Sequence, residues 1–116
     1  MKVIIDTSTW IAHFKKYSRN VERALKGGLV ILHPWIIGEL ALGDIPHRLR
    51  TLRDLKLLPQ VRVLPVDETF EFIERFELSG SGLGWVDINI LLSALSEGMG
   101  LITEDKKLRK TWEHLR

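Results

Sequence analysis

The sequence contains no cysteine, which excludes both a disulfide framework and a thiolate metal site. It has no long hydrophobic run either. The apolar start at Val3–Ile5 is cut by Asp6, unlike a secretory signal, and no stretch approaches the ~18 apolar residues of a membrane span. A large charge excess is also absent, because 17 Lys and Arg against 15 Asp and Glu leave a net charge of +2. That balance argues against a purely electrostatic nucleic-acid binder but leaves RNA binding open. We therefore expect a soluble, cytoplasmic protein.

What is present is the composition of one globular domain. The 116 residues suffice for a single domain over 1–116, and 45% apolar with 28% charged residues argue against disorder. Short apolar runs predict strands at 3–5, 29–32, 61–64 and 101–103. Helical patterns lie between them, at 8–25, 34–57, 67–78, 85–97 and from 106 to the end. This alternation predicts an α/β fold, with a parallel sheet covered by helices on both faces.

Local signals mark where several of these helices begin and end. Pro34 and Pro46 fit first-turn positions, and Asp67 fits an N-cap. The glycine-containing stretches 27–28, 80–82 and 98 indicate stops or hinges.

Two carboxylates directly follow expected strands. Asp6 ends the first strand, and Asp105 lies between the strand at 101–103 and the last helix. Residues just past the C-terminal ends of parallel strands line the ligand crevice of such a sheet. The alternative is that each acid caps the helix that follows it, which is the commoner role for either one taken alone.

Glu39 interrupts an apolar helical pattern, since it is the only charged residue of segment 34–42. Helical spacing places it on one stripe with Trp35, Ile36 and Leu42. A carboxylate on a core-facing stripe needs a cation or metal partner, and no basic residue is near in sequence.

Asp87 interrupts the next apolar pattern and shares a stripe with Ile90, Leu91 and Ala94. Its place in a first helical turn gains about 0.3–1 kcal/mol from the helix dipole. That gain is too small to offset the burial of an unpaired charge, so a partner is expected here as well.

These acids, two at strand ends and two on helices, are expected to converge at one edge of the sheet. Like charges so gathered raise one another's pKa unless a cation sits among them. An all-oxygen site suits Mg²⁺ or Mn²⁺ rather than zinc. The chemistry that needs such a site is metal-assisted hydrolysis of a phosphodiester. Ser8 and Thr103 are placed to support it by bonding a metal-bound water or a phosphate, with helix capping an equal alternative for Ser8.

Four segments carry a family resemblance: VIIDTSTWI at 3–11, HPWIIGELALG at 33–43, GLGWVD at 82–87 and LITEDKKL at 101–108. Together, in order and spacing, they resemble the PIN-domain ribonucleases, specifically the VapC-type toxins of bacterial and archaeal toxin–antitoxin pairs. The resemblance covers nearly the whole chain.

The resemblance implies a three-layer α/β sandwich with a mostly parallel central sheet of four to five strands, and an endoribonuclease activity. By position, it implies that Asp6, Glu39, Asp87 and Asp105 are a metal-binding and catalytic quartet for Mg²⁺ or Mn²⁺. The three aspartates bind metal most directly, and Glu39 orients or activates water. It also implies an RNA substrate, a homodimer and inhibition by a small VapB-like antitoxin.

Two features depart from the family pattern. Asn89 stands where close relatives often carry histidine, a position with a candidate role in RNA contact. The sequence reaches Arg116 just after the last expected helix, where the family usually adds a further strand.

Basic and aromatic residues complete the set of candidates. Lys106 and Lys107 directly follow Asp105, where they could contact RNA phosphates, the alternative being a solvated helix face. Trp35 and Trp85 sit in apolar patterns typical of a core. None of the four histidines has metal-ligand spacing, so we expect surface or structural roles for them.

A different class of function competes with the nuclease. A catalytically silent module of the same fold would bind RNA or a protein partner without cleaving it. The acids on apolar patterns argue against that alternative, because a silent module has no need for them.

Overall fold

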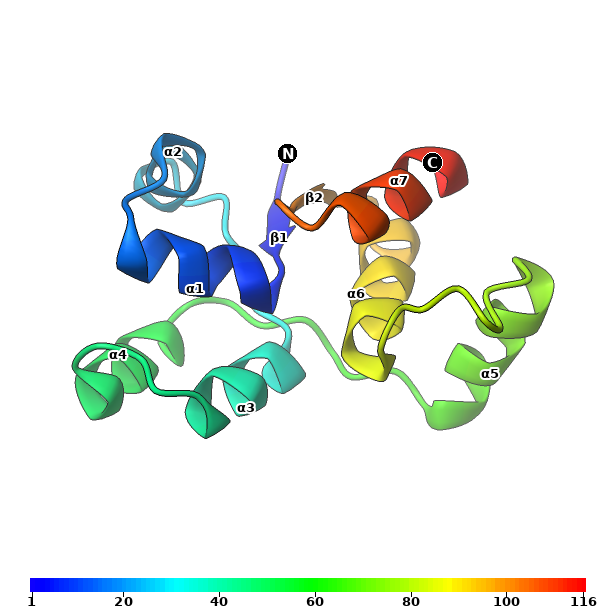
Figure 1. Cartoon of the computed structure of the whole chain (residues 1–116), viewed down its shortest axis with the longest axis horizontal. Helices are drawn as coiled ribbons and strands as arrows, with labels where there is room; N and C mark the ends of the chain where they lie inside the picture. The colour runs from blue at the N-terminus through cyan, green and yellow to red at the C-terminus, as the bar shows by residue number, and fades with distance from the viewer.

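The computed structural model describes all 116 residues and contains helices on both sides of a small parallel sheet (Figure 1). The strands are β1 (Val3–Ile5) and β2 (Gly100–Ile102). The helices are α1 (Thr7–Lys15), α2 (Arg19–Lys26), α3 (Pro34–Leu42), α4 (Arg48–Leu55), α5 (Val66–Arg75), α6 (Trp85–Ser96) and α7 (Lys106–Leu115). In Figure 1, α1 to α4 lie on one side of the strands and α5 to α7 on the other. No helix is long and apolar enough to cross a membrane.

The sheet is smaller than predicted. β1 and β2 pair in parallel, with Ile4 opposite Leu101, but there are two strands rather than four to five. The expected strands at 29–32 and 61–64 do not form. Segment 29–32 meets β1 only at the Val3–Val30 bridge. Its other bridge joins Leu32 to Gln60, the residue just before the expected strand at 61–64.

Local sequence explains why these ladders stay short. Leu32 accepts from the N–H of Val61 at 2.9 Å and donates to the carbonyl of Pro59 at 2.8 Å. Pro59 has no N–H with which to extend the pairing. On the other side, Pro34 starts α3 two residues after Leu32, which ends the extended segment.

Two of the predicted helices are each divided in two. The stretch at 8–25 is α1 and α2, because Ser18 starts a new helix by accepting a hydrogen bond from the N–H of Val21. The stretch at 34–57 is α3 and α4, with Gly43 extended at the end of α3 and His47 left-handed before α4.

The capping predictions have mixed outcomes. Pro34 is the first residue of α3, and Gly27 follows α2 as its C-cap, both as expected. Pro46 lies two residues before α4 rather than in its first turn. Asp67 is inside the first turn of α5, whose N-cap is Pro65.

The core holds the two strands and α6 together. α6 packs against both strands and against α5, while α1 packs against α3. Ile4 and Ile5 of β1 and Ile90 and Leu91 of α6 are fully buried in one hydrophobic cluster. Because β1 and β2 are parallel neighbours, the residues that follow them, from Asp6 and from Thr103, emerge at the same edge.

Candidate active site

Asp6 lies directly after β1, and its carboxylate is almost completely buried, with 2% of the residue exposed. The residue occupies the N-cap position of α1, but its side chain accepts from two hydroxyls rather than from a backbone N–H. Ser8 Oγ donates to Oδ2 at 2.8 Å, and Thr9 Oγ1 donates to Oδ1. These hydroxyl donors stabilise the ionised carboxylate and fix its orientation.

Asp105 lies after β2 and does cap α7, accepting from the N–H of Leu108 at 2.9 Å. Its own N–H donates to Thr103 Oγ1 at 3.0 Å, and Thr103 is buried. Thr103 therefore holds the loop that carries Asp105, while Ser8 contacts Asp6 itself. Helix capping was the alternative role considered for both acids. Asp105 does cap its helix through a side-chain hydrogen bond, whereas Asp6 occupies the N-cap position without making such a bond.

Asp87 projects from the first turn of α6 and is half-buried. Its pKa is raised to about 6, first by burial of the carboxyl and then by neighbouring negative charges. Those charges belong to Asp6, Asp105 and Glu39, in that order of effect. A hydrogen bond from the Gly84 backbone acts in the opposite direction. The carboxylate of Asp87 thus feels the charges of all three other predicted acids.

Glu39 joins this group from α3, but not from a buried face. The residue is exposed, and its Oε1 accepts from the Thr7 hydroxyl at the start of α1. Leu42, which the sequence placed on the same core-facing stripe, is 91% exposed. The buried side of α3 is instead formed by Ile36, Ile37 and Leu40. The prediction that Glu39 faces the core is therefore wrong.

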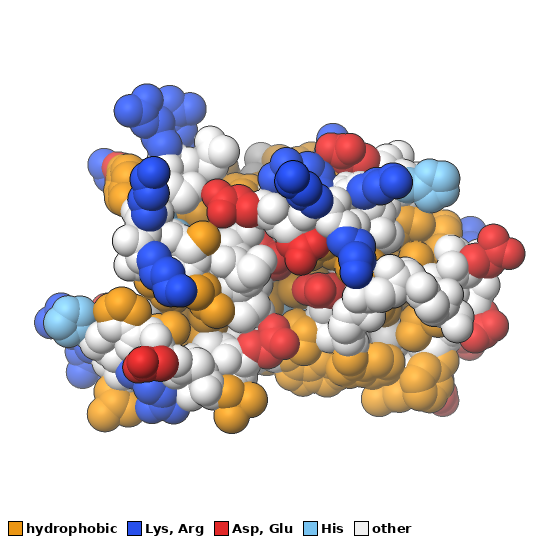
Figure 2. Space-filling model, viewed as in Figure 1, with side chains coloured by type: hydrophobic (Ala, Val, Ile, Leu, Met, Phe, Trp, Pro, Cys, Tyr) orange, Lys and Arg blue, Asp and Glu red, His pale blue; other side chains and the backbone are white.

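No basic side chain neutralises these acids. The two ion pairs of the chain are Lys26–Glu22 and Arg53–Asp54, and both are remote in sequence from the four carboxylates. Figure 2 shows acidic side chains gathered near the middle of one face, with basic side chains beside them. With their present hydrogen bonds, no three Asp, Glu or His side chains converge closely enough to hold a metal ion together.

All four carboxylates are engaged by hydroxyl or backbone donors, and two of the hydroxyl donors were not predicted. Thr9 is buried, and its Oγ1 also accepts from the N–H of Glu104 at 2.9 Å. Thr7 bonds Glu39. The signal that could have identified them is the run of hydroxyl residues, Thr7, Ser8 and Thr9, directly after Asp6.

Asn89 makes its hydrogen bonds inside the protein. The residue is buried with 2% exposed; its Oδ1 accepts from Thr69 Oγ1 at 2.8 Å and its amide donates to the Trp85 carbonyl at 2.9 Å. Both ends of the amide are therefore used inside the protein. This geometry favours a structural role for Asn89, and the contact with RNA considered from the sequence stays a prediction.

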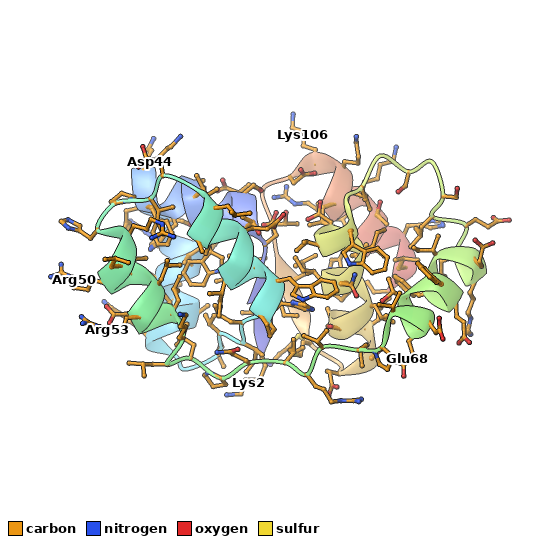
Figure 3. The ribbon with its side chains drawn as sticks, turned by 90° about the horizontal axis from the view of Figure 1, so that it is seen from below. Lys2, Asp44, Arg50, Arg53, Glu68 and Lys106 are labelled. Atoms are coloured by element: carbon orange, nitrogen blue, oxygen red, sulfur yellow. The ribbon has the colours of Figure 1, made fainter.

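Lys106 and Lys107 form the start of α7, next to Asp105, and both are exposed. In Figure 3, Lys106 extends away from the body of the molecule. The neighbouring Arg109 donates to the Thr103 carbonyl, which adds a second tie to the loop behind Asp105.

The tryptophans are only partly core residues. Trp10 and Trp112 are buried, whereas Trp85 is 38% exposed and stacks on Trp35 with 6.0 Å between ring centroids. The prediction that Trp85 is a core residue is therefore wrong. The exposed ring belongs to the first residue of α6 and contacts the rings of Trp35 and Phe70.

His33 has a structural role. It is buried and caps α3, accepting from the N–H of Trp35 at 3.0 Å through Nδ1. Burial lowers the pKa of His33 to about 4, so its ring is neutral at pH 7. His13 similarly accepts from the N–H of Ser18. These contacts confirm the expectation of structural roles for both.

Comparison with known proteins identifies the fold and the family of the chain. The family model described as PIN domain matches residues 3–113. Ribonuclease VapC32 of Mycobacterium tuberculosis, in strains CDC 1551 / Oshkosh and ATCC 25618 / H37Rv, is 40% identical over 108 residues, which cover 92% of this chain and 87% of that protein. The crystal structure of PAE2754 from Pyrobaculum aerophilum superposes with a TM-score of 0.63 over 99% of this chain and 89% of that one, at 19% identity, which shows a shared fold. The chain belongs to the PIN-domain family and, within it, to the VapC-type ribonucleases.

Proposed function

We propose that this protein is a metal-dependent endoribonuclease that acts in the cytoplasm as the toxin of a VapBC-type pair. The observation that carries the proposal is the effect of three carboxylates on a fourth, Asp87. Asp6, Glu39 and Asp105 all act on the pKa of Asp87, and no Lys or Arg forms an ion pair with any of them. A cluster of acids without a protein cation is what a divalent metal would complete.

The donor set fits Mg²⁺ or Mn²⁺, because every candidate ligand is a carboxylate oxygen and none is a thiolate or an imidazole. Asp6, Asp87 and Asp105 would hold the ion. When bound, such an ion lowers the pKa of a coordinated water and stabilises charge on the phosphoryl oxygens.

The chain's own residues prepare this site. Ser8 and Thr9 hold the Asp6 carboxylate from one side, and Thr103 fixes the loop that carries Asp105. Glu39 is exposed at the rim, where its free oxygen can orient a water molecule or accept a proton from it. Thr7 holds the other oxygen of Glu39 in place.

The partners we propose are RNA, a VapB-like antitoxin and a second copy of the chain. The relative VapC32 supports the first two through its name. A homodimer is supported by an apolar surface at the start of α6 and α5, where Phe70 is 53% exposed and lies edge-on to Trp85 at 5.8 Å. Light scattering on the wild type and on Phe70→Asp tests it: a dimer in the first and a monomer in the second are expected.

The activity is tested by incubating total cellular RNA with the purified, antitoxin-free protein. Parallel reactions contain Mg²⁺, Mn²⁺ or EDTA, and Asp87→Asn is the inactive control. We expect discrete fragments that need metal and that disappear in the variant. A folded, metal-loaded protein that binds RNA without cutting it would overturn the proposal in favour of a silent binding module.

A further inference from the structure

The side chain of Lys107 lies across the loop that joins α5 to α6, over Gly82. A Cβ placed on Gly82 would lie 2.7 Å from Lys107 Nζ and 3.4 Å from both Cδ and Cε. Gly82 also has a φ of +83°, in the region that favours glycine. The positive φ is what favours glycine here, and a Cβ at this position would also displace the end of the lysine side chain.

This contact joins the two segments that carry Asp87 and Asp105. The loop with Gly82 leads into α6 five residues before Asp87, and Lys107 follows Asp105 by two residues. Asp105 follows β2, and α6, which carries Asp87 in its first turn, packs against that strand. The Lys107–Gly82 contact therefore lies between the loop that leads to Asp87 and the start of the helix that follows Asp105.

The ammonium of Lys107 has no partner in the protein. It forms no ion pair within 4.0 Å, since the two ion pairs of the chain involve other residues, and it donates no side-chain hydrogen bond. Its stem lies over the backbone at Gly82, and its charge is not used by any partner within the protein.

An RNA backbone that approaches four carboxylates is repelled by them. A cation beside the carboxylates offsets that repulsion for the phosphate it meets and helps to set the register of the strand. Lys106 is worse placed for this, because it extends away from the molecule (Figure 3).

We propose that Lys107, seated on Gly82, is the residue that positions the RNA by binding a backbone phosphate next to the one that is cut. The inference rests on the proposed ribonuclease function and names one contact within it. Lys107 is a positioning residue, so its loss acts on substrate binding more than on the chemical step. Gly82 acts only through Lys107.

The test measures binding and cleavage separately. Binding of a fluorescent single-stranded RNA is followed over a series of salt concentrations in the Asp87→Asn protein, which cannot cut it. Lys107→Met keeps the stem and removes the charge, and Lys107→Arg restores a charge. Lys56→Met is the matched control, since Lys56 is also exposed and free of ion pairs but belongs to the end of α4.

We expect Lys107→Met to weaken binding about 5- to 10-fold and to reduce the salt slope by about one phosphate contact. Lys56→Met should change binding less than twofold, and Lys107→Arg should recover most of the affinity. In the cutting enzyme, Lys107→Met should raise KM with little change in kcat. Gly82→Ala should weaken binding by a similar factor, and adding it to Lys107→Met should have little further effect.

The outcomes separate the two proposals. Cleavage with equal effects of Lys107→Met and Lys56→Met overturns the role of Lys107 and leaves the nuclease intact. If RNA binding depends on Lys107 but the wild-type protein never cuts RNA, the positioning role is supported and the proposed nuclease activity is overturned. Failure of the Asp87→Asn protein to bind RNA at all overturns the positioning role whatever the cleavage result.

Discussion

The hydroxyl of Thr9 ties α1 to the segment after β2, because its Oγ1 accepts from the N–H of Glu104 at 2.9 Å across 95 residues of sequence. The same hydroxyl donates to the carboxylate of Asp6. One buried side chain thus links the ends of both strands and holds Asp6 beside the loop that carries Asp105. The hydroxyl itself is closed off from water, since Thr9 is 1% exposed.

Thr9→Val should therefore destabilise the protein while keeping its shape. Valine leaves the Glu104 N–H and one Asp6 oxygen unpaired, which costs about 1–3 kcal/mol of unfolding free energy. We expect cleavage to fall as well, because Asp6 loses its orientation. Urea unfolding and an RNA cleavage assay measure the two effects. Thr9→Ser, which keeps the hydroxyl, should stay close to wild type, and a Val variant of unchanged stability would contradict the prediction.

Asp87→Asn should abolish cleavage and stabilise the metal-free protein. The folded pKa of about 6 lies above the ordinary 3.8, so the folded state holds the proton more tightly. The stabilising contribution of protonated Asp87 is fully present below about pH 4 and is lost as the pH rises through 6. At pH 7.5 the charged carboxylate therefore costs stability, about 1–2 kcal/mol after allowance for its partial exposure to water.

Urea unfolding in EDTA at pH 7.5 measures this gain. Glu113→Gln is the matched control, because Glu113 is an exposed acid on α7 that does not act on Asp87. It should leave stability and cleavage unchanged. An Asp87→Asn protein less stable than the wild type at pH 7.5 would show that the ionised Asp87 carboxylate does not destabilise the folded protein.

Divalent metal should stabilise the wild type and not the Asp87→Asn protein. Binding to the folded state alone adds RT ln(1 + [L]/Kd), which is about 2.7 kcal/mol at a hundredfold excess over Kd. For a domain of this size that corresponds to a rise of several degrees in Tm. Thermal unfolding with Mn²⁺, with Mg²⁺ and with EDTA checks it. Equal shifts in both proteins would place the binding elsewhere.

His33 and Asp87 should oppose each other in their effect on acid stability. The pKa of His33 in the folded protein, about 4, lies below the ordinary 6.5. Neutral His33 therefore contributes to the free energy of unfolding above pH 6.5, and this contribution is lost as the pH falls toward 4. Over the same range Asp87 gains stability as it takes up a proton. The wild type should therefore change little in unfolding free energy between pH 4 and 6.5.

Removal of one group should reveal the other. In Asp87→Asn, stability should fall steeply from pH 6.5 to 4, because only the His33 contribution remains. His33→Asn keeps a side chain able to cap α3 and should remove that fall when combined with Asp87→Asn. Denaturant unfolding at several pH values measures the slopes. A flat profile in Asp87→Asn would contradict the assignment to His33.

Those parts of the fold that depend on local chemistry could be predicted from the sequence. Asp6 and Asp105 are at strand ends because each directly follows a short apolar run, and parallel pairing of β1 with β2 brings the two ends together. Pro34 at the start of α3 and Gly28 after α2, with a φ of +66°, mark helix ends through backbone constraints that do not depend on the rest of the chain.

What depends on distant packing could not be predicted. Segment 61–64 is apolar enough for a strand, but its pairing depends on where Leu32 and Pro59 lie. The periodicity that put Glu39 on a core face assumed that α3 is covered along its whole length, whereas Leu42 lies at its uncovered end. Glu39 belongs to the acidic cluster by its position in space, although the burial argument for it fails.

Asn89 offers the clearest test of a structural against a functional role. Its amide oxygen and the Thr69 hydroxyl form a buried pair between α5 and α6. Thr69→Val leaves that oxygen unpaired and should cost about 1–3 kcal/mol of unfolding free energy, as should Asn89→Ala. Because the two changes remove the same hydrogen bond, the double variant should lose clearly less than the sum of the single losses.

RNA cleavage should not change together with this loss of stability. When equal concentrations of folded protein are compared, Asn89→Ala should cut the same RNA positions at a rate close to wild type. Sequencing of fragment ends measures this. A changed set of cut positions at unchanged stability would return Asn89 to the RNA interface, since only direct contact could alter the choice of site without altering the fold.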